Sequence, residues 1–149
     1  MSRPVHIVIP AIGVSARIVR LGLNPDRTLE VPKNLADTGW LTEGPEPGER
    51  GAAVVVGHVA SLGGSGVFYR LRDVRPGDVI RIRLRDGEIV RYRARSMLVV
   101  PKTAFPTRRV YAQTPRPTLR LITCSGTMDA SSGHHPDNRI VFASLLSNA

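Results

Sequence analysis

The stretch that decides the fold spans residues 79–95 and reads VIRIRLRDGEIVRYRAR. Apolar and charged residues alternate on both sides of Asp86-Gly87, and a period of two is typical of strands with one buried and one solvated face. Asp-Gly between two such runs is a strong hairpin signal, because glycine supplies the positive φ that a tight turn needs. The stretch therefore predicts an antiparallel hairpin whose solvent face carries Arg81, Arg83, Arg85, Arg91, Arg93 and Arg95.

The rest of the chain consists of short apolar segments divided by glycine and proline, with no long helical period and no internal repeat. The candidate strands are His6–Pro10, Ala16–Leu21, Leu29–Val31, Ala52–Gly57, Val79–Leu84, Ile89–Val100, Leu119–Thr123 and Arg139–Leu145. Short helical turns are expected at Asn34–Thr38, Val67–Leu71 and Lys102–Phe105. Eight strands with few helices predict a mainly β fold closed into a barrel, because an open sheet would leave edge strands exposed.

Composition narrows the class of protein. The 149 residues, 42% of them hydrophobic, suit one compact domain over residues 1–149. The net charge of +9 suggests nucleic acid, anionic lipid or an acidic cell wall as surroundings. With three Tyr, three Phe and one Trp there is little aromatic surface on which bases could stack, so a solvated strand face explains the arginines more simply. No apolar stretch reaches the ~18 residues of a membrane span, and we expect the chain as given to be soluble.

Three predicted strand ends carry side chains suited to chemistry. The only cysteine, Cys124, ends one apolar run, His58 ends another, and Arg139 opens a third. A thiol needs a nearby base or cation to become a good nucleophile, and His58 is the one histidine of four with this strand-end placement. The guanidinium of Arg139 offers a fork of donors to an oxyanion. Taken singly, each residue also has an ordinary interpretation: a core cysteine, a satisfied core histidine and a surface ion pair.

These residues resemble the sortases, the cysteine transpeptidases of Gram-positive bacterial surfaces. The family's signature strand ends in Thr-Leu-x-Thr-Cys, and residues 120–124 read RLITC, with arginine in place of the first threonine. The family's histidine follows an apolar strand in a Gly-His context, which Gly57-His58 matches. Its arginine opens the strand after the cysteine loop, as Arg139 does. The order His, Cys, Arg agrees as well, and the match covers nearly the whole length.

The resemblance implies an eight-stranded barrel and acyl transfer in two steps. Cys124 would attack the Thr-Gly carbonyl of a C-terminal motif similar to Leu-Pro-x-Thr-Gly and form a thioacyl enzyme that an amine resolves. His58 would protonate the leaving amine and deprotonate the incoming one, and Arg139 would hold the substrate backbone or the oxyanion. Thr123 and Ser125, beside the nucleophile, are expected to contact substrate.

The resemblance also implies partners and a location. The donors would be surface proteins with a sorting motif, and the acceptor would be an amine of a peptidoglycan precursor or a pilin. Sortases are usually anchored by an N-terminal membrane helix, which this sequence lacks, so we expect the extracellular catalytic portion of a membrane-anchored enzyme, acting as a monomer. The compact size and the arginine-rich character look most like the actinobacterial class E and F sortases, with a preference for class F.

We expect no cofactor and no metal. Residues 99–119 contain no Asp or Glu, while Lys102, Arg108, Arg109 and Arg116 would repel a cation, so we predict calcium independence. His134 and His135 near Asp137 are expected to be solvated loop residues, because adjacent histidines seldom point at one ion. The alternative function is a basic, non-catalytic β-barrel that binds nucleic acid or cell wall, which would leave the placement of Cys124, His58 and Arg139 accidental. A papain-like protease is disfavoured because its cysteine precedes its histidine.

Overall fold

The computed structural model describes residues 2–22, 24–25, 30–61, 64–101, 107–111, 113–124 and 137–146. Its strands are β1 (Pro4–Ile9), β2 (Val14–Leu21), β3 (Thr38–Leu41), β4 (Gly51–His58), β5 (Ala60–Ser61), β6 (Gly64–Ser65), β7 (Val79–Leu84), β8 (Ile89–Pro101), β9 (Pro117–Cys124) and β10 (Asp137–Leu145). The helical elements are the 3-10 turns η1 (Pro10–Ile12) and η2 (Tyr69–Asp73) and the short helix α1 (Thr107–Val110).

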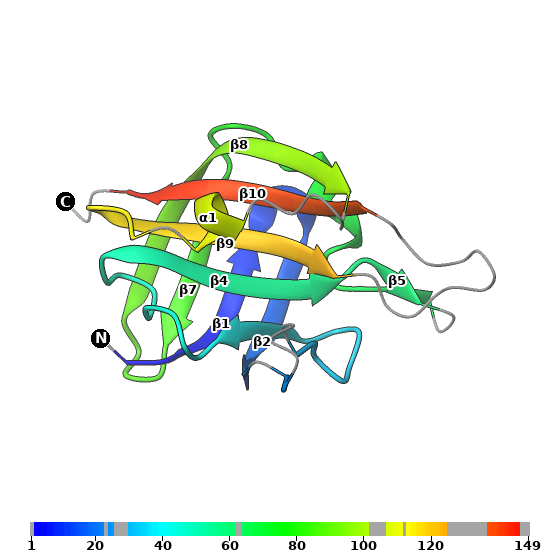
Figure 1. The fold of residues 1–149 in the computed structure, drawn as a ribbon, viewed down its shortest axis with the longest axis horizontal. Coiled ribbons are helices and arrows are strands. Elements are labelled where there is room, and N and C mark those ends of the chain that lie inside the picture. Colours follow the sequence, from blue (N-terminus) through cyan, green and yellow to red (C-terminus); the bar gives the residue numbers. More distant parts are fainter. Residues whose placement is uncertain are drawn as a thin grey trace.

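Eight strands close into a barrel in the order β1-β2-β3-β4-β9-β10-β8-β7. The β2–β3 and β4–β9 pairs run parallel, and the other six pairs are antiparallel. In Figure 1, β4, β9 and β10 lie side by side across the front, and β1, β2 and β7 cross behind them. The predicted mainly β, eight-stranded barrel is confirmed. Closure satisfies the backbone hydrogen bonds that an open sheet would leave exposed at its edges.

The β7–β8 hairpin forms where the alternation of residues 79–95 places it. Arg81 lies opposite Arg91 in the register, and Gly87 takes a φ of +93° in the connection. The connection is longer than a two-residue turn, because Leu84 closes the hairpin through hydrogen bonds with Glu88 and Gly87. Residues 89–93 of β8 pair with β7, and residues 92–101 pair with β10. A bulge between Ala94 and Ser96 in the β8–β10 pairing changes which side chains face the barrel interior.

Apolar side chains pack on both sides of the β4–β9–β10 wall. The interior of the barrel is filled by one cluster to which all eight strands contribute, including Val55, Leu121 and Val141. A second cluster covers the outer side of the wall with the alternate residues of the same strands: Val54, Val56, Ile122, Ile140 and Phe142, together with Leu21, Leu41 and Val110 of α1. A wall that is apolar on both faces is rigid, and each fully buried side chain of this size contributes about 1.5–3 kcal/mol to folding.

Two local expectations are wrong. The third barrel strand is Thr38–Leu41, whereas residues 30–31 of the expected strand Leu29–Val31 are irregular and Leu29 is outside the described residues. Val31 is 46% exposed, while all four residues of β3 are buried between β2 and β4. Residues 34–37 form a single turn closed by a hydrogen bond from the Asp37 amide to the Asn34 carbonyl, and Thr38 already belongs to β3, so no helix forms over Asn34–Thr38. Burial and strand pairing decide here over the apolar character of a short run.

Of the other two expected helical turns, one forms close to its expected position and one falls outside the described residues. The turn expected at Val67–Leu71 appears nearby as η2. The turn expected at Lys102–Phe105 lies outside the described residues, and α1 follows it.

Candidate active site

His58 and Cys124 end two neighbouring strands at the same level of the barrel. β4 and β9 run parallel, and their register pairs His58 with Cys124. Both strands point to the right in Figure 1. Backbones of adjacent strands lie about 4.8 Å apart, so the two residues are cross-strand neighbours although they are far apart in the sequence. A sheet buried on both faces holds both backbone positions firmly.

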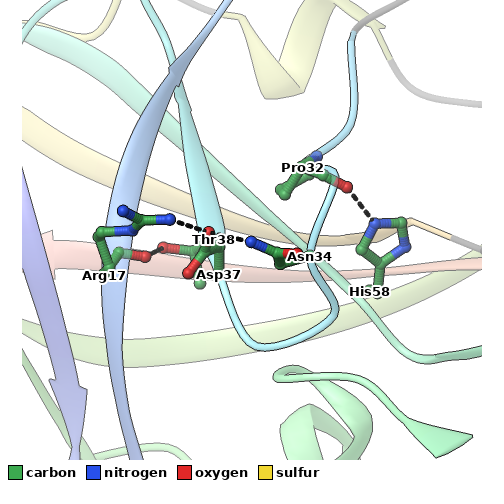
Figure 2. A network of polar contacts seen from close by, with 6 residues as sticks. All are labelled: Arg17, Pro32, Asn34, Asp37, Thr38 and His58. Carbon is green, nitrogen blue, oxygen red and sulfur yellow. Dashed lines mark hydrogen bonds and ion pairs between the residues drawn. The ribbon is translucent and has the colours of Figure 1, made fainter. Parts of the chain in front are cut away.

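The imidazole of His58 is buried, and its orientation is fixed by a backbone group. His58 is only 6% exposed. Its Nε2 lies 2.6 Å from the carbonyl oxygen of Pro32, and Figure 2 shows this contact. A carbonyl can only accept a hydrogen bond, so Nε2 must carry the hydrogen. In the neutral ring Nδ1 is therefore the basic nitrogen. Among the described residues, this buried Nδ1 has no hydrogen-bond partner.

The loop that supplies the Pro32 carbonyl is held by β2. Arg17 Nη2 donates to Asp37 Oδ2 at 2.6 Å, and Thr38 Oγ1 donates to the Arg17 carbonyl at 3.0 Å. Asn34 Nδ2 adds a longer hydrogen bond of 3.4 Å to the same carboxylate (Figure 2). The hydrogen bond from Arg17 lowers the pKa of Asp37, so this carboxylate is ionised at neutral pH. The loop between Pro32 and Thr38 is thus attached to β2 by both side-chain and backbone contacts.

Glycines allow the next segment to pack against the His58 backbone. A Cβ on Gly66 would lie 2.2 Å from the His58 carbonyl oxygen, and one on Gly57 would lie 2.8 Å from the Phe68 ring. The Phe68 amide donates to the His58 carbonyl at 2.9 Å. The close approach of the Phe68 ring explains glycine at position 57, one residue before the end of β4.

β10 places Arg139 beside Thr123, the residue before Cys124. Arg139 N–H donates to Thr123 Oγ1 at 2.8 Å, and Asn138 Nδ2 donates to the Thr123 carbonyl at 2.7 Å. Thr123 is buried at 4% exposure, so its hydroxyl fixes β10 to β9 immediately before the cysteine. His58, Cys124 and the start of β10 therefore form one row across three adjacent strands.

The Arg139 side chain lies on the other side of this row. Its Nη1 is 3.0 Å from Met97 Sδ, and Met97 packs against the interior cluster. His58 instead continues the alternation of Val54 and Val56, which belong to the outer cluster. Within the described residues no hydrogen bond joins Arg139 to His58. Met97 Sδ is the one hydrogen-bond partner of this guanidinium among the described residues, and a thioether is a weak acceptor.

Arg120, which stands where the family motif has its first threonine, attaches α1 to the barrel wall. Its guanidinium donates to the Arg109 carbonyl and stacks 4.7 Å from the centroid of the Phe142 ring, while Arg109 lies 4.8 Å from the same ring. Burial, together with the charge of Arg109, lowers the pKa of Arg120. A guanidinium stays protonated even so. The substitution therefore has a structural consequence, the docking of α1 on β9 and β10.

Several expected features lie outside the described residues: Ser125, His134 and His135, together with the side chains of Cys124 and Asp137. Among the residues that are described, no three His, Cys, Asp or Glu side chains gather as metal ligands. In the same part of the chain, no helix is long and apolar enough to span a membrane.

Sequence reasoning missed Pro32, Gly66 and Asn138. Pro32 acts through its backbone carbonyl, which leaves no residue-type signal, and nothing in the sequence distinguishes Gly66 from the other glycines among the 14. Asn138 has only its position beside Arg139 to suggest a role.

The sortase domain model matches residues 7–146. Similar solved structures include sortase C-1 from Actinomyces oris, with 23% identity and a TM-score of 0.73, covering 96% of this chain and 71% of that one. A sortase D5 transpeptidase of Clostridium perfringens has 23% identity and a TM-score of 0.72, with coverages of 97% and 79%. A lid mutant of sortase A from Corynebacterium diphtheriae has 23% identity and a TM-score of 0.74, with coverages of 100% and 74%. No curated protein sequence matches.

The domain match spans nearly the whole chain, and the chain belongs to the sortase family, whose members are cysteine transpeptidases. Sortases act on surface proteins with sorting motifs and on cell-wall or pilin acceptors, and they are cell-surface membrane enzymes. The structural similarities, at this level of identity, show the shared barrel.

Proposed function

We propose that Cys124 is the nucleophile and His58 the proton carrier of a transpeptidation that cleaves a C-terminal motif similar to Leu-Pro-x-Thr-Gly. The observation that carries this proposal is the register pairing of His58 with Cys124 at the ends of two parallel strands. A nucleophile and its base must lie within reach of each other, and this pairing places their backbones side by side.

In the first step the Cys124 thiolate attacks the threonine carbonyl carbon of the motif. The carbon–nitrogen bond to glycine breaks, and His58 gives its proton to the leaving amine. In the second step an acceptor amine attacks the thioester, His58 takes up the proton, and the thiolate leaves. The proton moves through Nδ1, because the Pro32 carbonyl keeps the hydrogen on Nε2 in place throughout.

Arg139 is proposed to donate to the oxyanion or to the substrate backbone. Its residue lies near the start of β10, next to the cysteine strand, and among the described residues its guanidinium contacts only the weak acceptor Met97 Sδ. Arg139 and His58 lie on opposite sides of the row, so they would contact the bound substrate from opposite sides. Substrate contacts by Thr123 and Ser125 stay predictions.

The finer assignments follow from the sequence. We propose a cell-wall or pilin amine as acceptor, a site on the extracellular face of the membrane, and membership of class F. The compact size, the arginine-rich composition and the run Ile140-Val141-Phe142 support the actinobacterial classes E and F, and between these two we prefer class F.

Mass spectrometry tests the proposal. The wild-type protein, incubated with a sorting-motif peptide, should gain the mass of the acyl fragment on Cys124, and hydroxylamine should remove it. Cys124→Ala should form no adduct and should unfold at the wild-type temperature, because it deletes the nucleophile and little volume. Peptide cleavage by the Cys124→Ala protein would disprove the mechanism.

A further inference from the structure

The outward side of the β7–β8 hairpin carries a cluster of like charges. Arg81 is directly opposite Arg91 in the register, Arg83 is opposite Ile89, and Arg93 is opposite Val79. Alternate residues of a strand share one face, and the residues between these arginines are buried in the barrel. The exposed residues Arg81, Arg83, Arg91 and Arg93 are called the arginine face below.

No carboxylate neutralises the arginine face within the described residues. β1, β2, β7 and β8, the four strands on this side of the barrel, contain no Asp or Glu. The ion pairs seen in the described part of the chain are Arg17–Asp37 and Arg70–Asp73, and neither includes an arginine of this face.

Folding does not require this arrangement. Like charges directly opposite each other, as at Arg81 and Arg91, destabilise an antiparallel pair. Any mixture of polar residues would keep the outer face of the strands solvated equally well, and alternating positive and negative charges would stabilise the strand pair. A surface of positive charges only, on a strand pair that these charges destabilise, indicates binding of an anionic partner.

The shape and chemistry of the face favour a membrane over nucleic acid. Tyr92, the aromatic residue between the arginines of β8, is fully buried, so the face offers no ring on which a base could stack. The arginines project from the convex outer side of a barrel, which suits a broad charged surface. Sortases are membrane enzymes, so an anionic membrane surface lies close to the protein.

We propose that the arginine face binds the anionic phospholipid headgroups of the membrane surface. In the barrel order β7 lies four strands from β4 in either direction, diametrically across the barrel from the strand that ends in His58. Binding through the hairpin therefore leaves the ends of β4 and β9 open to a sorting motif. Ion pairing between guanidinium and phosphate supplies the attraction.

Vesicle flotation tests this inference. The wild-type protein should bind vesicles of phosphatidylcholine mixed with phosphatidylglycerol, should not bind pure phosphatidylcholine, and should dissociate as salt rises. The double variant Arg81→Gln/Arg91→Gln should bind about tenfold or more weakly. It should unfold at the wild-type temperature or above, because a repulsion has been removed. A matched control, Arg50→Gln/Arg116→Gln, removes two exposed arginines elsewhere and should change binding no more than about twofold.

Three outcomes would overturn the inference: no preference for the anionic vesicles, an equal loss in both double variants, or binding of soluble polyphosphate or duplex DNA with the same affinity and the same dependence on Arg81 and Arg91. Without a preference for anionic vesicles, phospholipid headgroups are not the ligand. An equal loss in both double variants would mean that binding depends only on the net charge of the protein. Equal binding of polyphosphate or DNA would mean that the partner is a polyanion other than a membrane. None of them bears on transpeptidation, which the Cys124 adduct tests separately.

Discussion

His58 Nε2 lies 2.6 Å from the carbonyl oxygen of Pro32, so a backbone group of the segment between β2 and β3 sets the tautomer of the proposed proton carrier. The carbonyl cannot be replaced by mutation, but the loop that carries it can be loosened. Asp37 is the side chain that ties this loop to Arg17.

Asp37→Ala should lower kcat by roughly tenfold, because a displacement of the His58 ring well below 1 Å is enough to spoil proton transfer. Long-range 1H–15N correlation NMR spectra of the His58 ring should show the hydrogen on Nε2 in the wild type and a mixture of the two tautomers in the variant. Asp73→Ala is the matched control, since it breaks Arg70–Asp73, a second ion pair among the described residues. An unchanged NMR spectrum of His58 in Asp37→Ala would show that the attachment of the loop to Arg17 does not control the His58 tautomer.

The same carboxylate predicts a pH dependence of stability. Arg17 lowers the pKa of Asp37 in the folded protein, so the ionised group stabilises the fold above the ordinary aspartate pKa of about 4. This stabilisation is lost as pH falls through the lower, folded value. Urea denaturation of wild type and Asp37→Asn should therefore differ at pH 7 and converge in acid. A constant difference across this range would show that the charge is not responsible.

Gly66→Ala should reduce both stability and turnover. A Cβ there would lie 2.2 Å from the His58 carbonyl oxygen, so the histidine backbone must shift. Gly44→Ala is the control, because its Cβ would meet nothing closer than 3.6 Å and its φ is not positive. Peptide cleavage and thermal unfolding measure both effects. Similar behaviour of the two alanine variants would contradict the close packing at His58.

Arg139→Lys should be nearly as damaging as Arg139→Ala. A guanidinium can hold two parallel hydrogen bonds to a carbonyl or an oxyanion, and an ammonium cannot. Loss of one well-placed oxyanion donor costs on the order of a hundredfold in rate. Met97→Leu, which removes only the sulfur contact of Arg139, should retain activity. Near-wild-type transpeptidation by the lysine variant would mean that Arg139 acts through its charge alone.

Tyr92 predicts a loss of stability in alkali. Burial raises its pKa to about 12, and its hydroxyl accepts a hydrogen bond from the Gly48 amide. The neutral form stabilises the fold fully below pH 10, the ordinary tyrosine value, and this contribution of about 2–3 kcal/mol disappears as pH rises through 12. Tyr92→Phe should cost about 1 kcal/mol at pH 7 through the lost hydrogen bond and should lack the alkaline loss. Tyr69→Phe, at an exposed site, should keep it.

The sequence by itself determined the local structure wherever alternation or an apolar run coincided with burial. Residues 79–95 predict their hairpin, and β4, β9 and β10 lie where their apolar runs place them, because each strand buries its own side chains. The positions of His58 and Cys124 at strand ends, and of Arg139 near the start of β10, are also readable, since they follow from where the apolar runs begin and end.

Only the tertiary structure decided which of these ends meet. The parallel pairing of β4 with β9 joins segments far apart in the chain, and no local signal encodes its register. β3 was missed because Thr38–Leu41 is a strand only through its pairing with β2 and β4. The Pro32 carbonyl is common to every residue type, so its contact with His58 leaves no trace in the sequence. Backbone groups and strand pairing depend on the closed barrel as a whole, which is why they become visible only in three dimensions.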